Sequence, residues 1–526
     1  MTVQTTHPTV ADLLDRFLDG AAADQLEDRF VALVGAVWSP DGGANDLAVA
    51  AVTELVAAFG EADDERKGYL AVLLALLVES EYPAEEGPLT SAARAGLDRY
   101  LEALATGDAD RPFTLALLYL VSHFPGDRDR VLASVQDLAL DEHDLSRLDR
   151  GLQRLDLSRP DVGRVWPSPA IWKLGDEERG FDQEAVNALT PEQVKTNWDN
   201  DTRTVWAYWG MRAYWAVRNH TVPQEVAYPM PAEAADPPAP SELPAEAFLR
   251  HTEALRCASC RSRLDIREGS ARCGRCATTY PITHGLLDLS AGQSDEAWRE
   301  SAAEKSDDST ANLLSKLAAM PSMGYYYEAV LRPAFLRISG LNWGLAVTPA
   351  DEDAYLAAHT APVDGPVLDL AAGAGRWTEV VAQAVGTERL IAQDMGLPML
   401  TALRNRLPEV PAVVASALEI PFDDASLGGV NCWNALQAFP EQADLALREI
   451  GRVLKPGGTF TMLTFRWADD PLDRYFQASH FFPSRPAGML LFELDDIKKW
   501  LADAGLDIRH ESGTGTFVFI TAERRA

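Results

Sequence analysis

Apolar side chains recur every three or four positions through most of residues 1–220, and this spacing predicts amphipathic helices. The pattern is clearest over residues 10–18 and 64–79, and Gly, Pro and Asp residues separate the periodic segments. We therefore expect residues 1–220 to form an all-α domain. Further helices are predicted over residues 46–59, 91–106, 113–124 and 128–138.

Two of these segments, residues 113–124 and 128–138, are joined by a short turn and predict a helix–turn–helix unit. This unit loosely resembles the HEAT-type repeats, which stack helix pairs into a solenoid. Because no clean period runs through the segment, an irregular helical domain fits the pattern equally well. Either arrangement offers a surface for a protein partner or for a dimer. A packed, structural role is expected for His123, which lies near the end of a helix.

Aromatic residues are concentrated between residues 160 and 220. Trp206, Tyr208 and Trp209 cannot all lie on one face of a helix, so we expect this segment to be covered on more than one side. Clustered aromatic rings can line a pocket for a planar substrate, but a core or a domain interface is the commoner arrangement. A Pro-rich stretch follows at residues 221–250 and predicts an extended linker.

Beyond residue 363 the pattern changes to short apolar runs that alternate with helical segments, which is typical of a parallel sheet with crossover helices. Helices are expected over residues 376–385 and 495–504. Strands are expected at residues 367–370, 390–394, 412–415, 429–434, 506–510 and 516–521, with residues 452–460 leading into one more.

The turn after the first of these strands consists of small residues and leads directly into a helix. Small residues let a backbone pass close to a ligand, and a helix N-terminus beside the turn favours phosphate or nucleotide binding. The next strand ends at Asp394, whose carboxylate can accept both ribose hydroxyls of a nucleoside. The alternative is that Asp394 caps the helix that starts near residue 397. Both roles are compatible.

The order of these features resembles the Rossmann-like S-adenosylmethionine-dependent methyltransferases, whose first motif reads roughly D/E-x-G-x-G-x-G. Asp369, Gly373 and Gly375 match that motif, and Ala371 replaces its first glycine, which costs little unless φ is positive. The Leu-Lys-Pro-Gly-Gly turn at residues 454–458 is a further match. The resemblance implies a mostly parallel, seven-stranded sheet and S-adenosyl-L-methionine as cofactor.

The chain departs from the family in two places. Ser416 and Ala417 stand where many members carry Asp-Ala in contact with the adenine amino group, and residues 427–428 replace the usual Phe-Asp. In similar enzymes a Tyr-rich segment forms a lid, which here corresponds to residues 320–345; a helix packed against the sheet is the alternative. The resemblance implies cofactor contacts by Asp369, Ala371, Gly373, Gly375, Asp394, Met395, Ser416, Ala417 and Asn434, with Tyr326, Tyr327 and Arg332 as lid candidates.

Four cysteines, Cys257, Cys260, Cys273 and Cys276, have the spacing C-x₂-C-x₁₂-C-x₂-C, which suits tetrahedral zinc. Because four thiolates complete the ligand shell, we expect structural rather than catalytic Zn²⁺. The following residues, 280–287, resemble the zinc ribbon of tRNA-methyltransferase activator subunits, which is also found fused to methyltransferase domains. We therefore expect a ribbon at residues 251–292 and a methyltransferase domain at residues 293–526.

Composition narrows the classes of function. The chain has 47 basic and 79 acidic residues and a formal net charge of −32, a field that repels phosphate backbones. Paired C-x₂-C spacings within an odd total of five cysteines favour metal in a reducing compartment over disulfides. We see no signal peptide, and the longest apolar run, residues 69–78, is too short to span a bilayer. We expect a cytoplasmic protein with neither nucleic acid nor membrane as partner.

These features predict S-adenosylmethionine-dependent methyl transfer to a small aromatic or polyketide-like natural-product metabolite. Such enzymes act mainly by positioning and desolvation, so few side chains need do covalent work. His480, within an aromatic segment, is the candidate general base, with a packing role as the alternative. Two other functions stay open. One is methylation of rRNA or tRNA, which the ribbon suggests and the charge opposes, and the other is a non-catalytic scaffold with a protein-binding helical domain.

Overall fold

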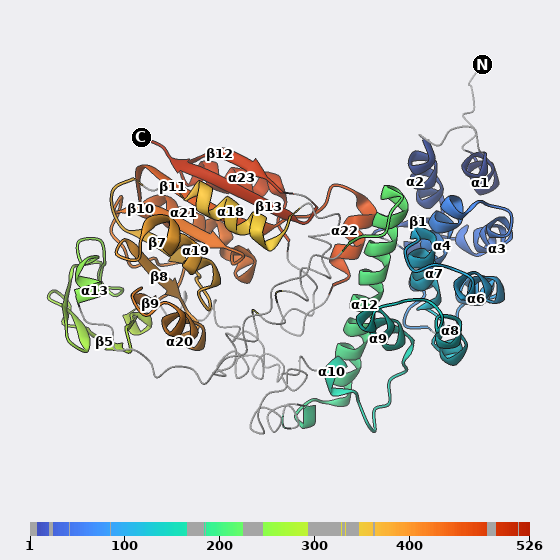
Figure 1. The fold of residues 1–526 in the computed structure, drawn as a ribbon, viewed down its shortest axis with the longest axis horizontal. Coiled ribbons are helices and arrows are strands. Elements are labelled where there is room, and N and C mark those ends of the chain that lie inside the picture. The colour runs from blue at the N-terminus through green and yellow to red at the C-terminus, as the bar shows by residue number, and fades with distance from the viewer. Residues whose placement is uncertain are drawn as a thin grey trace, which may run out of the picture. The chain divides into compact units, whose positions relative to one another are not determined.

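The computed structural model describes residues 8–19, 25–41, 43–84, 86–165, 184, 186–224, 246–292, 328, 332, 347–360, 363–480, 491–513 and 515–526. The chain divides into two compact units, which are coloured along the sequence in Figure 1. The first, here called the helical unit, comprises residues 1–168, 189–224 and 469–489. The second, the sheet unit, comprises residues 169–188, 225–468 and 490–526. The sequence predicted boundaries at residues 220, 250 and 292, and it placed residues 469–489 in the methyltransferase domain instead of the helical unit.

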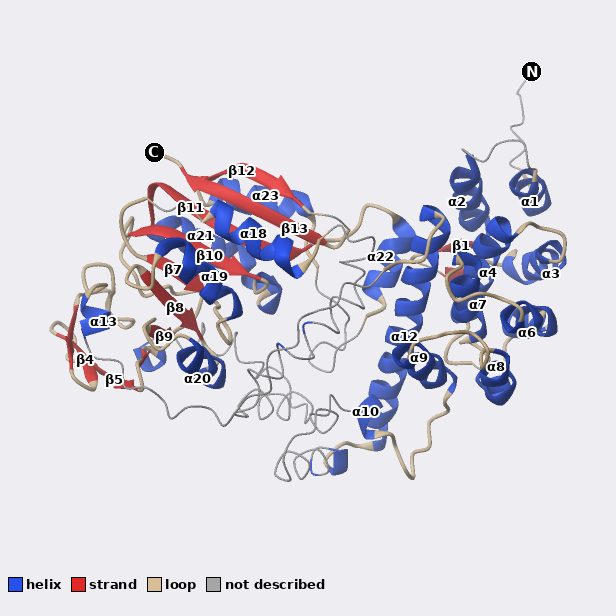
Figure 2. Cartoon of the chain, in the orientation of Figure 1, coloured by secondary structure: helices blue, strands red, loops and turns tan. Residues whose placement is uncertain are grey.

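The described part of the helical unit consists of helices and one very short strand pair (Figure 2). The helices predicted at residues 10–18 and 64–79 are present with those bounds, and the segment 91–106 forms two helices instead of one. The elements are α1 (Val10–Leu18), α2 (Leu26–Val37), β1 (Trp38–Ser39), β2 (Gly43–Ala44), α3 (Ala48–Phe59), α4 (Asp64–Glu79), α5 (Pro88–Arg94), α6 (Leu97–Ala105), α7 (Pro112–Val121), α8 (Arg128–Ser134), α9 (Glu142–Leu152), α10 (Val162–Val165), α12 (Pro191–Asn219) and α22 (Pro471–Ala478).

The longest helix, α12, carries the aromatic cluster. It starts with a capping box, in which Thr190 and Gln193 each bond the other's backbone N–H. Trp206, Tyr208 and Trp209 are all buried, because α4, α7, α9 and α22 pack on different sides of this helix. The prediction that this segment is covered on more than one side is confirmed.

Residues 469–478 enter the helical unit as α22. The carboxylate of Asp470 caps this helix and also accepts a hydrogen bond from the Tyr214 hydroxyl at 3.1 Å. The Tyr475 hydroxyl donates to Glu79 at 2.8 Å. Close packing depends on Gly210 of α12, since a Cβ added there would lie 2.2 Å from the Phe476 ring. Glycine is therefore needed where the two helices touch.

The sheet unit contains a single sheet of 11 strands in the order β12-β13-β11-β10-β7-β8-β9-β6-β5-β4-β3. Strands β11, β10, β7, β8, β9 and β6 are parallel, and the pairs outside them are antiparallel. The prediction of seven strands was wrong, because the cysteine-bearing strands continue the sheet through the pairing of β6 with β9. The strands are β3 (Leu264–Arg267), β4 (Ser270–Cys273), β5 (Thr279–Thr283), β6 (Leu286–Asp288), β7 (Val367–Leu370), β8 (Leu390–Asp394), β9 (Ala412–Val414), β10 (Leu427–Trp433), β11 (Leu454–Phe465), β12 (Leu506–Ser512) and β13 (Phe517–Arg524).

Helices join the parallel strands as expected for crossover connections. Fully buried strands such as β7 and β10 explain the continuous apolar runs in the sequence. Within the described residues, no helix is long and apolar enough to cross a membrane. The helices are α13 (Glu246–Leu249), α18 (Pro349–His359), α19 (Arg376–Val385), α20 (Leu397–Arg406), α21 (Ala443–Val453) and α23 (Leu494–Asp503).

Candidate functional site

A cavity of about 300 Å³ lies at the carboxyl ends of β7, β8, β9 and β10, where ligands bind in open parallel sheets. The walls come from the turn after β7, the end of β8, the residues after β9 and the end of β10. Eight of the sequence-predicted site residues line this cavity: Ala371, Gly373, Asp394, Met395, Ser416, Ala417, Asn434 and Arg332. Gly375 does not line it, but its neighbours Ala374 and Arg376 do.

The turn after β7 has a left-handed backbone at Ala371, Gly373 and Gly375, with φ of 54°, 56° and 87°. A Cβ added at Gly373 would meet nothing within 4 Å, so this glycine leaves open space beside the cavity. A Cβ at Gly375 would lie 2.8 Å from Leu403, so the second glycine allows α19 and α20 to pack closely. Ala371 adopts a positive φ, which is the condition under which the sequence predicted that alanine carries a strain cost.

Asp394 joins the turn to the end of β8. Its Oδ2 accepts a hydrogen bond from Gly373 N at 2.9 Å, and its Oδ1 accepts one from Gly396 N at 2.8 Å. Burial raises the pKa of Asp394, and the backbone amides of Gly396, Gly373 and Met395 oppose that rise. Each carboxylate oxygen has a second lone pair, so Asp394 can still accept hydroxyl donors from the cavity. The backbone contact at Gly396 shows that it also supports the turn before α20.

Asp369 is not among the described residues that line the cavity, and its predicted cofactor contact stays a prediction. Its carboxyl is buried, and its Oδ2 accepts a hydrogen bond from the Thr378 hydroxyl at 2.5 Å. This bond ties the middle of β7 to α19, so Asp369 supports the turn from beneath. Burial raises the pKa of Asp369 to about 7.

The residues after β9 form another wall. Ser416 and Ala417 line the cavity as predicted, and the Ser416 hydroxyl accepts a hydrogen bond from Leu418 N at 3.1 Å. The Gln393 amide donates to the Ser416 carbonyl at 3.0 Å and holds this wall against β8. The sequence analysis missed Gln393. A polar residue inside the otherwise apolar run 390–393 could have indicated that its side chain makes a specific hydrogen bond.

Arg332 reaches the cavity, but its guanidinium is bonded to neighbouring side chains. One nitrogen donates to both oxygens of Glu352 at 2.9 Å, and another donates to Asn434 Oδ1 at 3.0 Å. Burial raises the pKa of Glu352, and the charge of Arg332 opposes the rise. Arg332 therefore braces Asn434, which has a left-handed φ of 57°, and its predicted contact with the cofactor stays a prediction. Tyr326, Tyr327 and most of residues 320–345 lie outside the described residues.

Further lining residues were missed from the sequence. They include Glu328, which accepts hydrogen bonds from Arg406 at 2.6 and 2.7 Å, and Arg376, which donates to Asp353 at 2.6 Å. Apolar groups make up the rest of the described wall: Leu370, Ala372, Ala374, Trp377, Met399, Ala415, Leu418, Trp433, Ala435, Ala438 and Phe439.

His480 lies in the helical unit and does not line this cavity. Its side chain is fully buried, and its Nδ1 pairs with the Phe476 carbonyl at 2.7 Å. These contacts favour the packing role over that of a general base, which stays a prediction.

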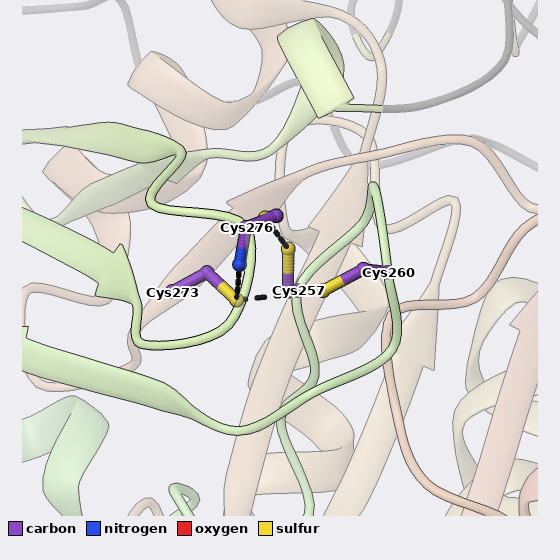
Figure 3. A group of neighbouring side chains, drawn as sticks. All are labelled: Cys257, Cys260, Cys273 and Cys276. Atoms are coloured by element: carbon purple, nitrogen blue, oxygen red, sulfur yellow. Dashed lines mark hydrogen bonds between the residues drawn. The ribbon is translucent and has the colours of Figure 1, made fainter.

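The four predicted metal ligands come together around one point (Figure 3), with all ligand atoms within 4.8 Å of one another. The Sγ atoms of Cys257 and Cys276 are 3.6 Å apart, and those of Cys260 and Cys273 are 3.4 Å apart. A tetrahedron with Zn–S bonds of about 2.3 Å has edges of about 3.8 Å, so the donor set fits such an ion. No other described group of three or more His, Cys, Asp or Glu side chains is comparable.

Comparisons with known proteins agree with this geometry. A family model described as a methyltransferase domain matches residues 367–458. A ubiquinone/menaquinone biosynthesis C-methyltransferase (UbiE) of Neisseria meningitidis is 33% identical over 143 residues, which are 26% of this chain and 58% of the relative. A demethylmenaquinone methyltransferase of Paenarthrobacter aurescens is 31% identical over 173 residues, which are 29% of this chain and 67% of the relative. The chain belongs to the S-adenosylmethionine-dependent methyltransferases.

The similarity is partial. The chain spans 52% of an uncharacterised methyltransferase of Schizosaccharomyces pombe, with 31% identity, and little more than half of several UbiE relatives. Among solved structures, a complex of the Haloferax volcanii Trm112 activator with a methyltransferase matches at 18% identity and a TM-score of 0.29, covering 33% of this chain and 89% of that chain. A Bacillus halodurans methyltransferase matches at 17% and 0.29, covering 33% and 99%.

Proposed function

We propose that the chain transfers a methyl group from S-adenosyl-L-methionine to a small aromatic or polyketide-like metabolite. The observation that carries this proposal is the pairing of Asp394 with the backbone of Gly373 at the rim of the cavity. It places a carboxylate and an open glycine turn side by side at the carboxyl ends of parallel strands. This arrangement suits a nucleoside with a polar chain attached.

The cavity residues fit that cofactor. Asp394 would accept the ribose hydroxyls, and the space beside Gly373 would admit the atoms attached to the sugar. Ser416 and Ala417 would lie along the base. When bound, S-adenosylmethionine supplies an electrophilic methyl group. The chain's own residues position the reactants and exclude water, the two effects on which such transfers mainly depend.

Apolar walls favour a flat, weakly polar acceptor. Trp377, Trp433 and Phe439 present ring surface, and Met399 supplies an adaptable apolar contact. Two relatives are named for the biosynthesis of ubiquinone or menaquinone, and those names support an aromatic acceptor here. The acceptor atom could be oxygen, nitrogen or carbon, and the UbiE relative is named as a C-methyltransferase, so all three are to be tested.

RNA methylation is the second candidate, and the cysteine-bearing ribbon favours it. Arg256 and Arg261 of the ribbon, however, pair with Asp423 and Glu449 of the same unit. A net charge of −32 further opposes binding to a phosphate backbone. The charge also argues against a scaffold that binds nucleic acid. If the chain is instead a non-catalytic scaffold for protein partners, it should convert no S-adenosylmethionine to S-adenosylhomocysteine.

We also propose that the four cysteines hold one structural Zn²⁺. All four donors are thiols, and four thiolates leave no open position for catalysis. The ribbon strands continue the sheet that carries the cavity, so the ion would stabilise the sheet unit as a whole.

Release of S-adenosylhomocysteine tests the proposal. The full chain would be incubated with S-adenosylmethionine and, in separate reactions, hydroxylated naphthoates, quinols, total tRNA and rRNA fragments. We expect turnover with aromatic acceptors and mass-spectrometric detection of a methylated product. Turnover with RNA alone would overturn the small-molecule proposal, and cofactor binding without turnover on any acceptor would favour the scaffold.

A further inference from the structure

The helical unit contains a second cavity, of about 290 Å³, which the methyltransferase site does not explain. It is lined by residues from the end of α4, the turn that follows it, the end of α9 and the first half of α12. All of its lining residues belong to the helical unit, so it is a feature of that unit alone. Its volume is close to the lower end of known ligand pockets.

Flat rings form much of its wall. The buried indole of Trp206 stacks on the imidazole of His123, with centroids 4.3 Å apart and planes 28° apart. The Tyr82 ring meets Trp206 edge-on at 5.0 Å. Trp198 adds a second indole, and its other neighbour is the Arg164 guanidinium, 3.5 Å from the ring centroid. A planar ligand would find stacking and edge contacts here.

The polar atoms of His123, Trp206 and Tyr82 are already engaged in hydrogen bonds within the protein. His123 pairs through Nδ1 with the Tyr119 carbonyl at 2.9 Å and through Nε2 with Glu79 at 3.3 Å. Trp206 Nε1 donates to the Ser122 carbonyl at 3.2 Å, and the Tyr82 hydroxyl donates to Asp199 at 2.6 Å. The rings therefore offer the cavity apolar surface and no spare acid or base. This is the chemistry of a binding site and not of a reaction centre.

Charged groups are confined to the mouth. Lys195 and Arg154 are exposed cations on the lining, and Asp199 is the carboxylate there, paired with Lys195 at 2.5 Å. Among the described lining residues there are thus two cations and one carboxylate, although acidic residues greatly outnumber basic ones in the chain. This local reversal favours a ligand whose exposed end is anionic.

We propose that this cavity binds a planar aromatic carboxylate, with its ring among Trp206, Trp198 and Tyr82 and its carboxylate near Lys195 at the mouth. The site is separate from the methyltransferase cavity, and its occupation does not depend on methyl transfer. It gives the aromatic cluster a role beyond core packing.

The test is calorimetry and saturation-transfer NMR on the full chain with 1-naphthoate as probe, in saturating S-adenosylhomocysteine. The second ligand fills the cofactor part of the methyltransferase cavity, and the variants described below separate binding in the helical unit from binding at the proposed acceptor wall. We expect a Kd below about 1 mM. Cyclohexanecarboxylate, which is not flat, and 1-naphthylmethylamine, which is cationic, should each bind at least about fivefold more weakly.

Two variants locate the site. Ala84→Phe places a large side chain at an exposed lining position and should weaken 1-naphthoate binding at least about tenfold, while the exposed Ala57→Phe on α3 should not. Lys195→Gln should weaken binding about two- to fivefold. Its matched control is Lys499→Gln, because Lys499 is also exposed and pairs with an aspartate four residues ahead.

Lack of probe binding to the native chain, or unchanged affinity in both Ala84→Phe and Lys195→Gln, would overturn the proposal. If Ala84→Phe fails to fold, the comparison of Lys195→Gln with Lys499→Gln decides the matter. If the native chain binds 1-naphthoate but transfers no methyl group to any acceptor, that result would contradict the proposed function and leave the proposed binding site standing.

Discussion

Removal of the Asp394 side chain tests the cofactor pocket most directly. Asp394→Ala deletes the acceptors for Gly373 N and Gly396 N, which lie 2.9 and 2.8 Å from the carboxylate. Each such bond to a charged group is worth about 1.5–3 kcal/mol. Burial raises the pKa of Asp394, so the ionised carboxylate also carries a desolvation cost that offsets part of this. We expect the free energy of unfolding to fall by about 1–3 kcal/mol.

Affinity for S-adenosylhomocysteine should fall further than this stability change suggests. The ribose hydroxyls lose a charged acceptor, which costs about 1.5–3 kcal/mol, or roughly ten- to 150-fold in Kd. The freed Gly373 N–H also lets the open turn move, which adds a cost of ordering on binding.

Isothermal titration calorimetry of the folded variant measures this loss. Asp496→Ala is the matched control, because it removes an exposed carboxylate from the first turn of α23 in the same unit. A folded Asp394→Ala protein with native affinity would refute the assignment of β8 as the ribose-binding strand.

The remaining predictions concern stability and metal content. Metal analysis should find about one zinc per chain, and Cys273→Ser should lower the melting temperature; a reduced, folded protein without metal would contradict the ribbon assignment. Gly210→Ala should cost about 1–3 kcal/mol in denaturant titrations, because its Cβ would lie 2.2 Å from the Phe476 ring, and a neutral result would mean that α22 does not pack there. Ala371→Gly should add up to about 1 kcal/mol of stability by relieving a positive φ, and a loss of stability would show that the cost is paid elsewhere in the turn. Burial raises the pKa of Asp369 from 3.8 to about 7, so the folded chain keeps a proton that the unfolded chain has released between these values. Stability should therefore fall as pH rises through this window, by up to about 1.4 kcal/mol per unit, and Asp369→Asn should remove that slope in pH-dependent unfolding.

Local patterns predicted the elements well. The spacing of apolar residues gave α1 and α4 with their observed bounds, because each is capped by a Thr or Asp side chain that the sequence shows directly. The strands β7 and β8 and the helix α19 were likewise predicted, since buried parallel strands are continuous apolar runs. The wall residues near Gly373 and Ser416 followed from the resemblance and from strand order.

Contacts between distant segments could not be read from the sequence. The bond between Tyr475 and Glu79 joins residues 396 positions apart, and no local pattern marks either partner. The same holds for Arg332, whose partners Glu352 and Asn434 decide whether it binds a ligand or braces the wall. The positive φ of Ala371 was also hidden, because alanine gives no compositional signal for a left-handed backbone.

The cysteine-bearing strands show why the sheet had more strands than predicted. Residues 286–288 of β6 pair with residues 412–414 of β9, and Leu289 N donates to the Val414 carbonyl at 3.0 Å. Arg256 N and the Arg261 guanidinium donate to the carbonyls of Pro421 and Ile420. Together with the bond from Leu289 to Val414, these bonds hold the ribbon against both ends of residues 414–421, which follow β9.

That segment includes the cavity wall at Ser416 and Ala417. The buried core is also continuous, since Cys257 and Tyr280 of the ribbon belong to the same cluster as Leu370 and Val413 of the central sheet. A change at the cysteines therefore acts on the wall through backbone pairing and shared core. The ribbon is a structural part of the sheet unit, and the proposed Zn²⁺, although it has no open coordination position, would act on the cofactor pocket through the contact of the ribbon with β9.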